Sequence, residues 1–61
     1  MLRVYLCNPE SGFPLYKVYE SENYTQAFMF AFSLNDSINV PHWVKIFRGS
    51  EVDPYVELPK K

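Results

Sequence analysis

Three stretches of this sequence alternate apolar and polar side chains with a period of two, and this pattern constrains the fold more than any other feature. The stretches cover residues 2–7, 13–20 and 42–48. The loop between the first two reads Asn-Pro-Glu-Ser-Gly, so these two strands are predicted to form a β-hairpin. Residues 55–58 are expected to add a short fourth strand, and residues 59–61 to fray at the end of the chain.

One helix is predicted over about residues 22–34, between the second and third strands. Ser21 suits the N-cap position of this helix. Apolar side chains then recur at helical spacing: Tyr24, Ala27, Phe28, Ala31 and Phe32. Three phenylalanines at every second position would also fit a strand, but Met29 and the alanines favour the helix. The polar run 35–37 and then Pro41 predict its end.

The predicted element order, ββαβ(β), belongs to the α+β class. We expect a small antiparallel β-sheet of three or four strands with one α-helix packed on one face. All 61 residues are expected to form a single domain. A domain of this size hides only about 60% of the surface that its unfolded chain exposes, so its free energy of unfolding is expected to be roughly 3–9 kcal/mol. Association with a partner subunit would raise this free energy of unfolding.

Composition and charge exclude several classes of protein. Hydrophobic residues make up 48% of the chain and aromatic residues 18%, which is too much for a disordered segment. The longest apolar run, residues 27–32, is far shorter than the ~20 residues of a membrane span, and the first residues show no signal peptide. A cytoplasmic location is therefore expected, in the host cytoplasm if the protein is viral. The net charge of −1 is typical neither of a duplex-binding protein nor of a whole-molecule DNA mimic.

Residues that could carry catalysis or bind metal are scarce. His42 is the only histidine and Cys7 the only cysteine, and nothing in the sequence supplies a third group to orient them. The carboxylates lack metal-ligand spacing, and the two glycines form no phosphate-binding loop. We therefore predict a protein that is not an enzyme and has no metal or cofactor, with Cys7 as inert packing and His42 as a surface or capping residue.

Strand alternation divides the side chains of the sheet between two faces. The face predicted to meet the helix carries Leu2, Val4, Leu6, Tyr16, Val18, Val44 and Ile46. The opposite face is predicted to carry Arg3, Tyr5, Cys7, Leu15, Lys17, Tyr19, Trp43, Lys45 and Phe47. A bulge or a register slip would exchange the two sets locally.

The second face is predicted to bind a partner, because basic residues alternate with aromatic rings on it. Rings can anchor a protein partner or stack with bases, and the cations would attract carboxylates or phosphates. The expected partner-binding residues are Tyr5, Tyr19, Trp43, Phe47, Arg3, Lys17 and Lys45. The alternative interpretation is that these side chains simply cover the sheet.

The predicted helix is apolar almost all round. Met29 and Phe30 lie off its sheet-facing side, where we expect the self-association surface of a homodimer. Alternatively, Phe30 folds under loop 35–41 or under the C-terminal segment. Acidic residues gather near the start of the helix and near the C-terminus, where they would either imitate a few phosphates or be solvated loop charges. These residues are Glu20 and Glu22, with Glu10 on the preceding loop, and then Glu51, Asp53 and Glu57.

The order of elements resembles that of the small phage-encoded inhibitors of uracil-DNA glycosylase. The resemblance covers about residues 3–48, with Gly12 and Tyr16 as matching landmarks, whereas the helix here is richer in Phe and Ala and less acidic. It implies inhibition of such an enzyme by local DNA mimicry.

The leading functional prediction is a non-enzymatic protein that binds and modulates a larger intracellular protein, most simply by inhibiting it, as a phage-type accessory or anti-host factor would. One alternative is single-stranded nucleic-acid binding through the basic and aromatic sheet face. The others are glycosylase inhibition by mimicry and a homodimer contact with no further role for that face.

Overall fold

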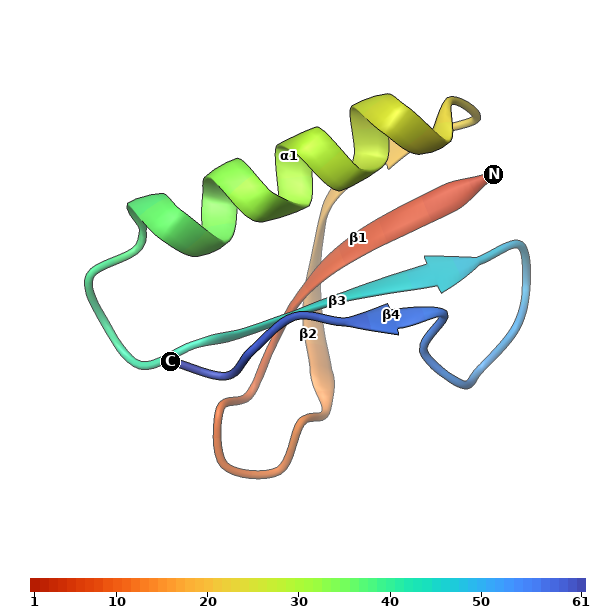
Figure 1. Cartoon of the computed structure of the whole chain (residues 1–61). Coiled ribbons are helices and arrows are strands. Elements are labelled where there is room, and N and C mark those ends of the chain that lie inside the picture. Colours follow the sequence, from red (N-terminus) through yellow and green to blue (C-terminus); the bar gives the residue numbers. More distant parts are fainter.

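A computed structural model describes all 61 residues and confirms the predicted α+β class. Four antiparallel strands form one sheet, and a single helix crosses one of its faces (Figure 1). The elements are β1 (Leu2–Cys7), β2 (Pro14–Ser21), α1 (Tyr24–Ser37), β3 (Trp43–Arg48) and β4 (Val56–Glu57). The strand order across the sheet is β2-β1-β3-β4, so β1 and β3 are central and β2 and β4 form the edges.

The hydrophobic core lies between α1 and the inner faces of the two central strands. Its buried side chains are Leu2, Val4, Ala27, Ala31, Val44, Ile46 and Leu58. The four from β1 and β3 are those that strand alternation predicted to meet the helix. Full burial of a Val, Leu or Ile side chain stabilises a fold by about 1.5–3 kcal/mol, so this small cluster dominates the stability of the domain.

Strand β2 departs from regular alternation. Its register against β1 shifts twice, and the pairs on either side of one shift are Val4–Tyr19 and Tyr5–Lys17. Val18 is the extra residue, and an extra residue reverses which face the following side chains take. Tyr19 therefore lies on the helix side, where it packs against the core. Its predicted place on the opposite face is wrong.

Two more β2 residues were predicted to meet the helix, and they do not. Tyr16 pairs with Leu6 but is exposed, because α1 crosses the other end of β2 (Figure 1). Val18 is exposed because it is the unpaired residue of the register shift. The edge strand is thus covered only near its C-terminal end.

Helix α1 begins and ends later than predicted. Its N-cap is Asn23, whose side-chain oxygen accepts the backbone N–H of Gln26. The Ser21 hydroxyl, two residues before this N-cap, instead accepts the N–H of Asn23. At the other end the helix continues through residues 35–37 to a C-cap at Ile38.

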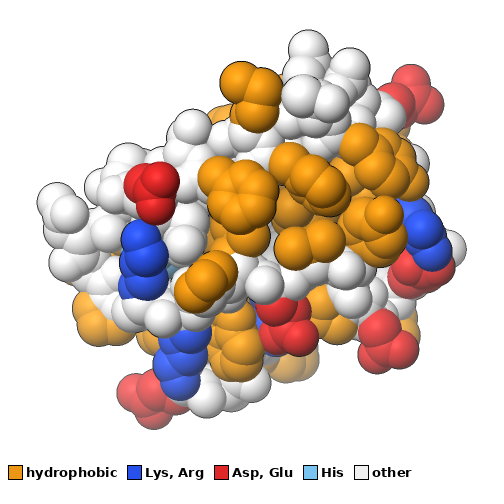
Figure 2. Space-filling model, viewed as in Figure 1, with side chains coloured by type: hydrophobic (Ala, Val, Ile, Leu, Met, Phe, Trp, Pro, Cys, Tyr) orange, Lys and Arg blue, Asp and Glu red, His pale blue; other side chains and the backbone are white.

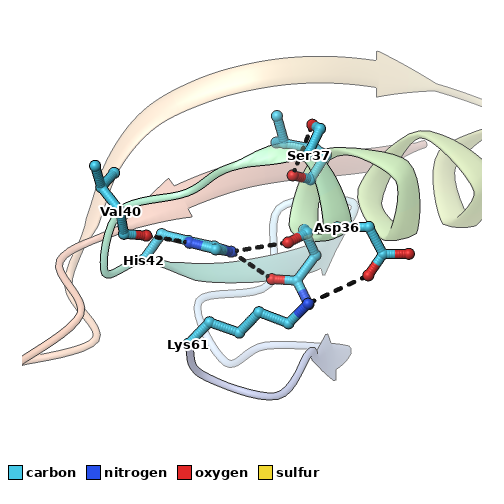
Figure 3. A network of polar contacts seen from close by, with 7 residues as sticks. Asp36, Ser37, Val40, His42 and Lys61 are labelled. Carbon is cyan, nitrogen blue, oxygen red and sulfur yellow. Dashed lines mark hydrogen bonds and ion pairs between the residues drawn. The ribbon is translucent and has the colours of Figure 1, made fainter.

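A polar network joins the end of α1 to the start of β3 (Figure 3). Asn35 and His42 are both buried. The His42 Nδ1 lies 2.6 Å from the Val40 carbonyl oxygen, and its Nε2 lies 2.8 Å from Oδ1 and 3.1 Å from the backbone oxygen of Asn35. Because the histidine meets a carbonyl of the last helical turn, the helix can run past Leu34. His42 is therefore a buried capping residue.

The C-terminal residues are hydrogen-bonded rather than frayed. Lys61 exchanges two backbone hydrogen bonds with His42, with N···O distances of 2.8 and 3.0 Å. The Lys61 ammonium lies 3.3 Å from the Asp36 carboxylate (Figure 3). The Leu58 N–H also donates to the Val44 carbonyl oxygen, so the chain follows β3 on both sides of β4.

Candidate interaction surface

Loops cover much of the sheet face opposite α1, which was predicted to be exposed. Gly12, in the loop between β1 and β2, lies directly against Trp43 and Lys45. Cys7 and Phe47 are buried on this face, at 2% and 5% exposed. Tyr5 and Trp43 are half-buried. The structure brings most of the predicted rings to one face but leaves little of their surface free.

The amino group of Lys45 is engaged inside the protein. It donates to the Gly12 carbonyl oxygen at 2.9 Å and lies 3.4 Å from the Glu57 carboxylate. It also sits 4.2 Å from the centre of the Trp43 ring, a cation–π contact. Lys45 therefore fixes a loop in place.

Arg3 and Lys17 also have partners within the chain. Arg3 donates to the Tyr5 hydroxyl at 3.3 Å and to the Glu51 carbonyl oxygen at 3.0 Å. The Lys17 ammonium lies 2.6 Å from the Glu20 carboxylate. This hydrogen bond raises the pKa of Lys17 and lowers the pKa of Glu20. All three cations of the predicted binding face thus contact oxygen atoms of the protein itself.

The predicted acidic clusters are partly neutralised in the same way. Glu20 pairs with Lys17, Glu51 with Arg48 and Glu57 with Lys45. Neither cluster therefore presents an uninterrupted row of free carboxylates, as an imitation of consecutive phosphates would need.

Tyr19 and Phe30 stack on each other between β2 and α1. Their ring centres are 4.3 Å apart and their planes differ by 8°. Phe30 therefore packs on a strand, under neither of the two segments considered from the sequence. Met29 beside it is 64% exposed. The two predicted self-association residues thus differ, one half-buried and the other largely in solvent.

A second aromatic group lies on the other flank of α1, beside the C-terminal segment. The ring centres of Tyr24 and Phe28 are 6.4 Å apart, and Tyr55 approaches them to 6.0 and 6.4 Å. Phe32 follows Phe28 by one helical turn on the same side. We call Tyr24, Phe28, Phe32 and Tyr55 the aromatic surface. Figure 2 shows hydrophobic side chains gathered in one continuous area over this side of the molecule.

Much of the aromatic surface faces solvent. The exposed fractions are 43% for Tyr24, 50% for Phe32 and 39% for Tyr55. The Arg48 guanidinium borders it, 4.7 Å from the Tyr55 ring centre and 3.3 Å from the Glu51 carboxylate. That hydrogen bond with Glu51 raises the pKa of Arg48. Adjoining exposed rings with a charged border are typical of protein contact sites.

The helical spacing predicts that Tyr24, Phe28 and Phe32 share one face of the helix with Ala27 and Ala31. In the structure Ala27 and Ala31 are fully buried against the sheet, where their small side chains let the helix approach closely. Phe28 packs against the core as predicted, whereas Tyr24 and Phe32 are exposed. Two alanines four residues apart were the signal in the sequence. The place of Tyr55 depends on the pairing of β4 with β3, which no local pattern specifies.

The two most reactive side chains are not arranged for chemistry. Cys7 pairs in register with Trp43, next to His42, but the His42 ring nitrogens contact oxygens of Val40 and Asn35. Burial raises the pKa of the Cys7 thiol, the opposite of what a nucleophile requires. The structure groups no three His, Cys, Asp or Glu residues as metal ligands.

Comparisons with protein-family models, with characterised proteins and with solved structures find no match to this chain. No helix of the structure combines the length and the apolar character that crossing a membrane requires.

Proposed function

We propose that this protein is a non-enzymatic interaction domain that docks onto a larger protein through the aromatic surface and modulates it. The observation that carries the proposal is the exposure of adjoining rings above a core that is already complete. Ala27 and Ala31 are fully buried between helix and sheet and Phe28 packs against them in the core, whereas Phe32 and Tyr55 are exposed and lie outside the core cluster.

Covering these rings would release a useful binding free energy. An aromatic side chain presents about 150–250 Å², and roughly half of it is still exposed here. At about 25 cal/mol per Å² of apolar surface, burying the rest contributes about 2 kcal/mol per ring. Two or three such rings in one patch give the aromatic cluster that commonly dominates a protein interface.

The border of the patch favours a partner with an acidic group beside an apolar groove. Arg48 lies over Tyr55 and has an exposed carboxylate, Glu51, as its counter-ion. An exposed ion pair of this kind is worth about 0–1 kcal/mol, so Arg48 can exchange Glu51 for a carboxylate of the partner at little cost. Arginine beside aromatic rings is a common composition of interface hot spots.

The expected effect on the partner is inhibition in the cytoplasm. With no catalytic constellation, the domain acts by occupying a surface that the partner needs, or by holding one of its conformations. A small accessory factor of the phage type, directed at a host protein, is the setting that fits such an inhibitor.

Affinity capture with matched variants tests the proposal. Wild type, Phe32→Ser and Tyr55→Ser are used as bait in lysate of the encoding cell or its host, with nuclease present. Val52→Ser is the control, because Val52 is an exposed apolar residue outside the aromatic surface. We expect one protein to be retained by wild type and control and lost with the other two. After purification, its Kd should rise at least about 30-fold for Phe32→Ser.

Two outcomes would count against this function. Equal affinity of the purified partner for wild type and Phe32→Ser would show that the aromatic surface does not bind it. Material that is captured only without nuclease would instead indicate nucleic-acid binding, the second prediction from the sequence.

A further inference from the structure

Strand β2 leaves one edge of the sheet free. It is the longest strand, with eight residues, and it pairs only with β1. A free edge presents unpaired backbone N–H and C=O groups to any strand that can align with them. Leu15, Tyr16 and Val18 are all exposed along this strand, so apolar area is available beside the backbone groups.

We propose that the occupant of this edge is a second copy of the chain. The two β2 strands would pair antiparallel about a twofold axis between Val18 and Tyr19. The result is a closed homodimer with one eight-stranded sheet and a helix on the same face in each half. This inference concerns self-association and is independent of the docking function proposed above.

The charges of β2 are complementary to themselves when the strand is reversed. The twofold axis places Lys17 opposite Glu20 of the partner subunit, and Glu20 opposite the partner's Lys17. In a regular strand, residues three apart point to opposite faces, so these two could not meet in such a pair. The register shift removes that obstacle. Lys17 pairs with Tyr5 and Glu20 with Arg3, which puts both side chains on the face away from α1.

The ion pairs set the alignment of the two strands more than the strength of the dimer. Within one copy, Lys17 and Glu20 already contact each other, and both are partly exposed. Dimerisation exchanges two internal ion pairs for two between subunits. The favourable terms are the new backbone hydrogen bonds and the burial of Tyr16 and Val18, while the charges disfavour other registers.

Strand pairing between copies would stop at a dimer, because the opposite edge of the sheet is not suited to it. Strand β4 has only two residues and offers no comparable edge. Pro14 at the start of β2 and the register shift at Leu15 beside it limit pairing to the segment that follows. A twofold contact that uses the same edge in both copies is closed, so it does not grow into a fibre.

The dimer would leave both aromatic surfaces free. Strands β2 and β4 are at opposite edges of the sheet, and Tyr55 immediately precedes β4. The two copies would join at β2 and carry their aromatic surfaces at the far ends. Met29, predicted from the sequence to lie in a self-association surface, is on the β2 flank of the helix next to the Tyr19–Phe30 stack.

A charge-exchange experiment tests the inference on the purified protein alone. Lys17→Glu leaves two acidic residues at the paired positions, and Glu20→Lys leaves two lysines, so neither variant can form the internal pair. By sedimentation equilibrium, wild type should form a dimer. Each variant alone should dissociate with a Kd raised at least about tenfold. An equimolar mixture should return to dimeric mass. Glu22→Lys is the control for Glu20→Lys, with the same charge change on an exposed residue outside β2.

Two results would overturn the proposal. The first is a wild-type protein that remains monomeric up to about 1 mM. The second is a mixture of the two variants that associates no more than either variant alone, because only pairs between subunits gain from mixing. Circular dichroism of each variant verifies folding, which both exposed substitutions should preserve.

Discussion

The ammonium group of Lys45 lies 2.9 Å from the carbonyl oxygen of Gly12, and this contact holds the loop between β1 and β2 over the sheet face opposite α1. Gly12 has a φ of +77°, in the left-handed region that favours glycine. A Cβ atom at this position would lie 2.8 Å from Lys45 Nζ and 2.8 Å from Trp43 Cζ3. Glycine is therefore required here both for backbone conformation and for space.

We expect Gly12→Ala to lower the free energy of unfolding by about 2–4 kcal/mol, because left-handed strain adds to a steric clash. Gly49→Ala is the matched control. Gly49 also has positive φ, at +58°, but a Cβ there would meet nothing within 4 Å. It should cost only about 1 kcal/mol. Urea denaturation measures both values, and equal costs would contradict the role given to the loop contact.

Lys45 and Glu57 form an ion pair in which the lysine is buried and the glutamate exposed. We therefore expect substitution of Lys45 to lower the free energy of unfolding more than substitution of Glu57. Lys45→Met leaves the Gly12 carbonyl oxygen without its donor, at a cost of about 1–3 kcal/mol. Glu57→Gln removes a carboxylate whose side chain is 49% exposed, and should cost less than about 1 kcal/mol. The comparison uses the midpoint of urea denaturation at neutral pH. A larger effect of Glu57→Gln would show that the ion pair, not the loop contact, is the main role of Lys45.

Cys7 should react slowly in the native protein. It is buried, and burial raises the pKa of its thiol above the ordinary 9.0. At pH 8 we expect a disulfide reagent to modify it at least about tenfold more slowly in the folded protein than in urea. Equal modification rates in the folded and the unfolded protein would contradict the burial of the Cys7 thiol.

The same pKa shift has a consequence at high pH. The native state holds the thiol proton more tightly than the unfolded chain does. The associated stability is therefore complete below pH 9.0 and is lost as the pH rises through the higher native value. Cys7→Ser should weaken this alkaline loss. Thermal unfolding of both proteins between pH 8 and 11 measures the difference.

The parts of the fold that local patterns determine were predictable. The alternation of Leu2 and Val4, and of Val44 and Ile46, identified the buried face of both central strands. Turn residues located the hairpin, and the fold class followed from the order of elements. These features depend on neighbours within a few residues, which the sequence displays directly.

Features that depend on distant contacts were missed. The register shift in β2 moved Tyr19 to the helix side, and no local pattern marked Val18 as the extra residue. The sheet face opposite α1 was predicted to be exposed, but the loop that contains Gly12 lies against Trp43 and Lys45, and strand alternation does not reveal such a loop. The aromatic surface needs Tyr55, which comes into place only through the pairing of β4 on β3.

The two alanines of the helix predict how tightly α1 must pack. Ala31 is fully buried against the sheet. We expect Ala31→Leu to cost about 1–3 kcal/mol, because three added carbon atoms would force the helix away from the core. Ser33→Leu, at an exposed position of the same helix, should change the free energy of unfolding by less than about 0.5 kcal/mol. A tolerated Ala31→Leu would mean that the helix does not sit as close as described.

The contact between His42 and Asn35 should stabilise the last turn of α1 without changing the packing of the core. His42→Ala removes the ring that meets the Asn35 backbone and side-chain oxygens, and leaves both buried without a partner. We expect a loss of about 1–3 kcal/mol and faster amide exchange confined to residues 34–38. A double-mutant cycle with Asn35→Ala should give a coupling of at least about 0.5 kcal/mol, because the two side chains share one network. Additive losses would instead mean that His42 acts mainly through Val40 and the backbone pairing with Lys61.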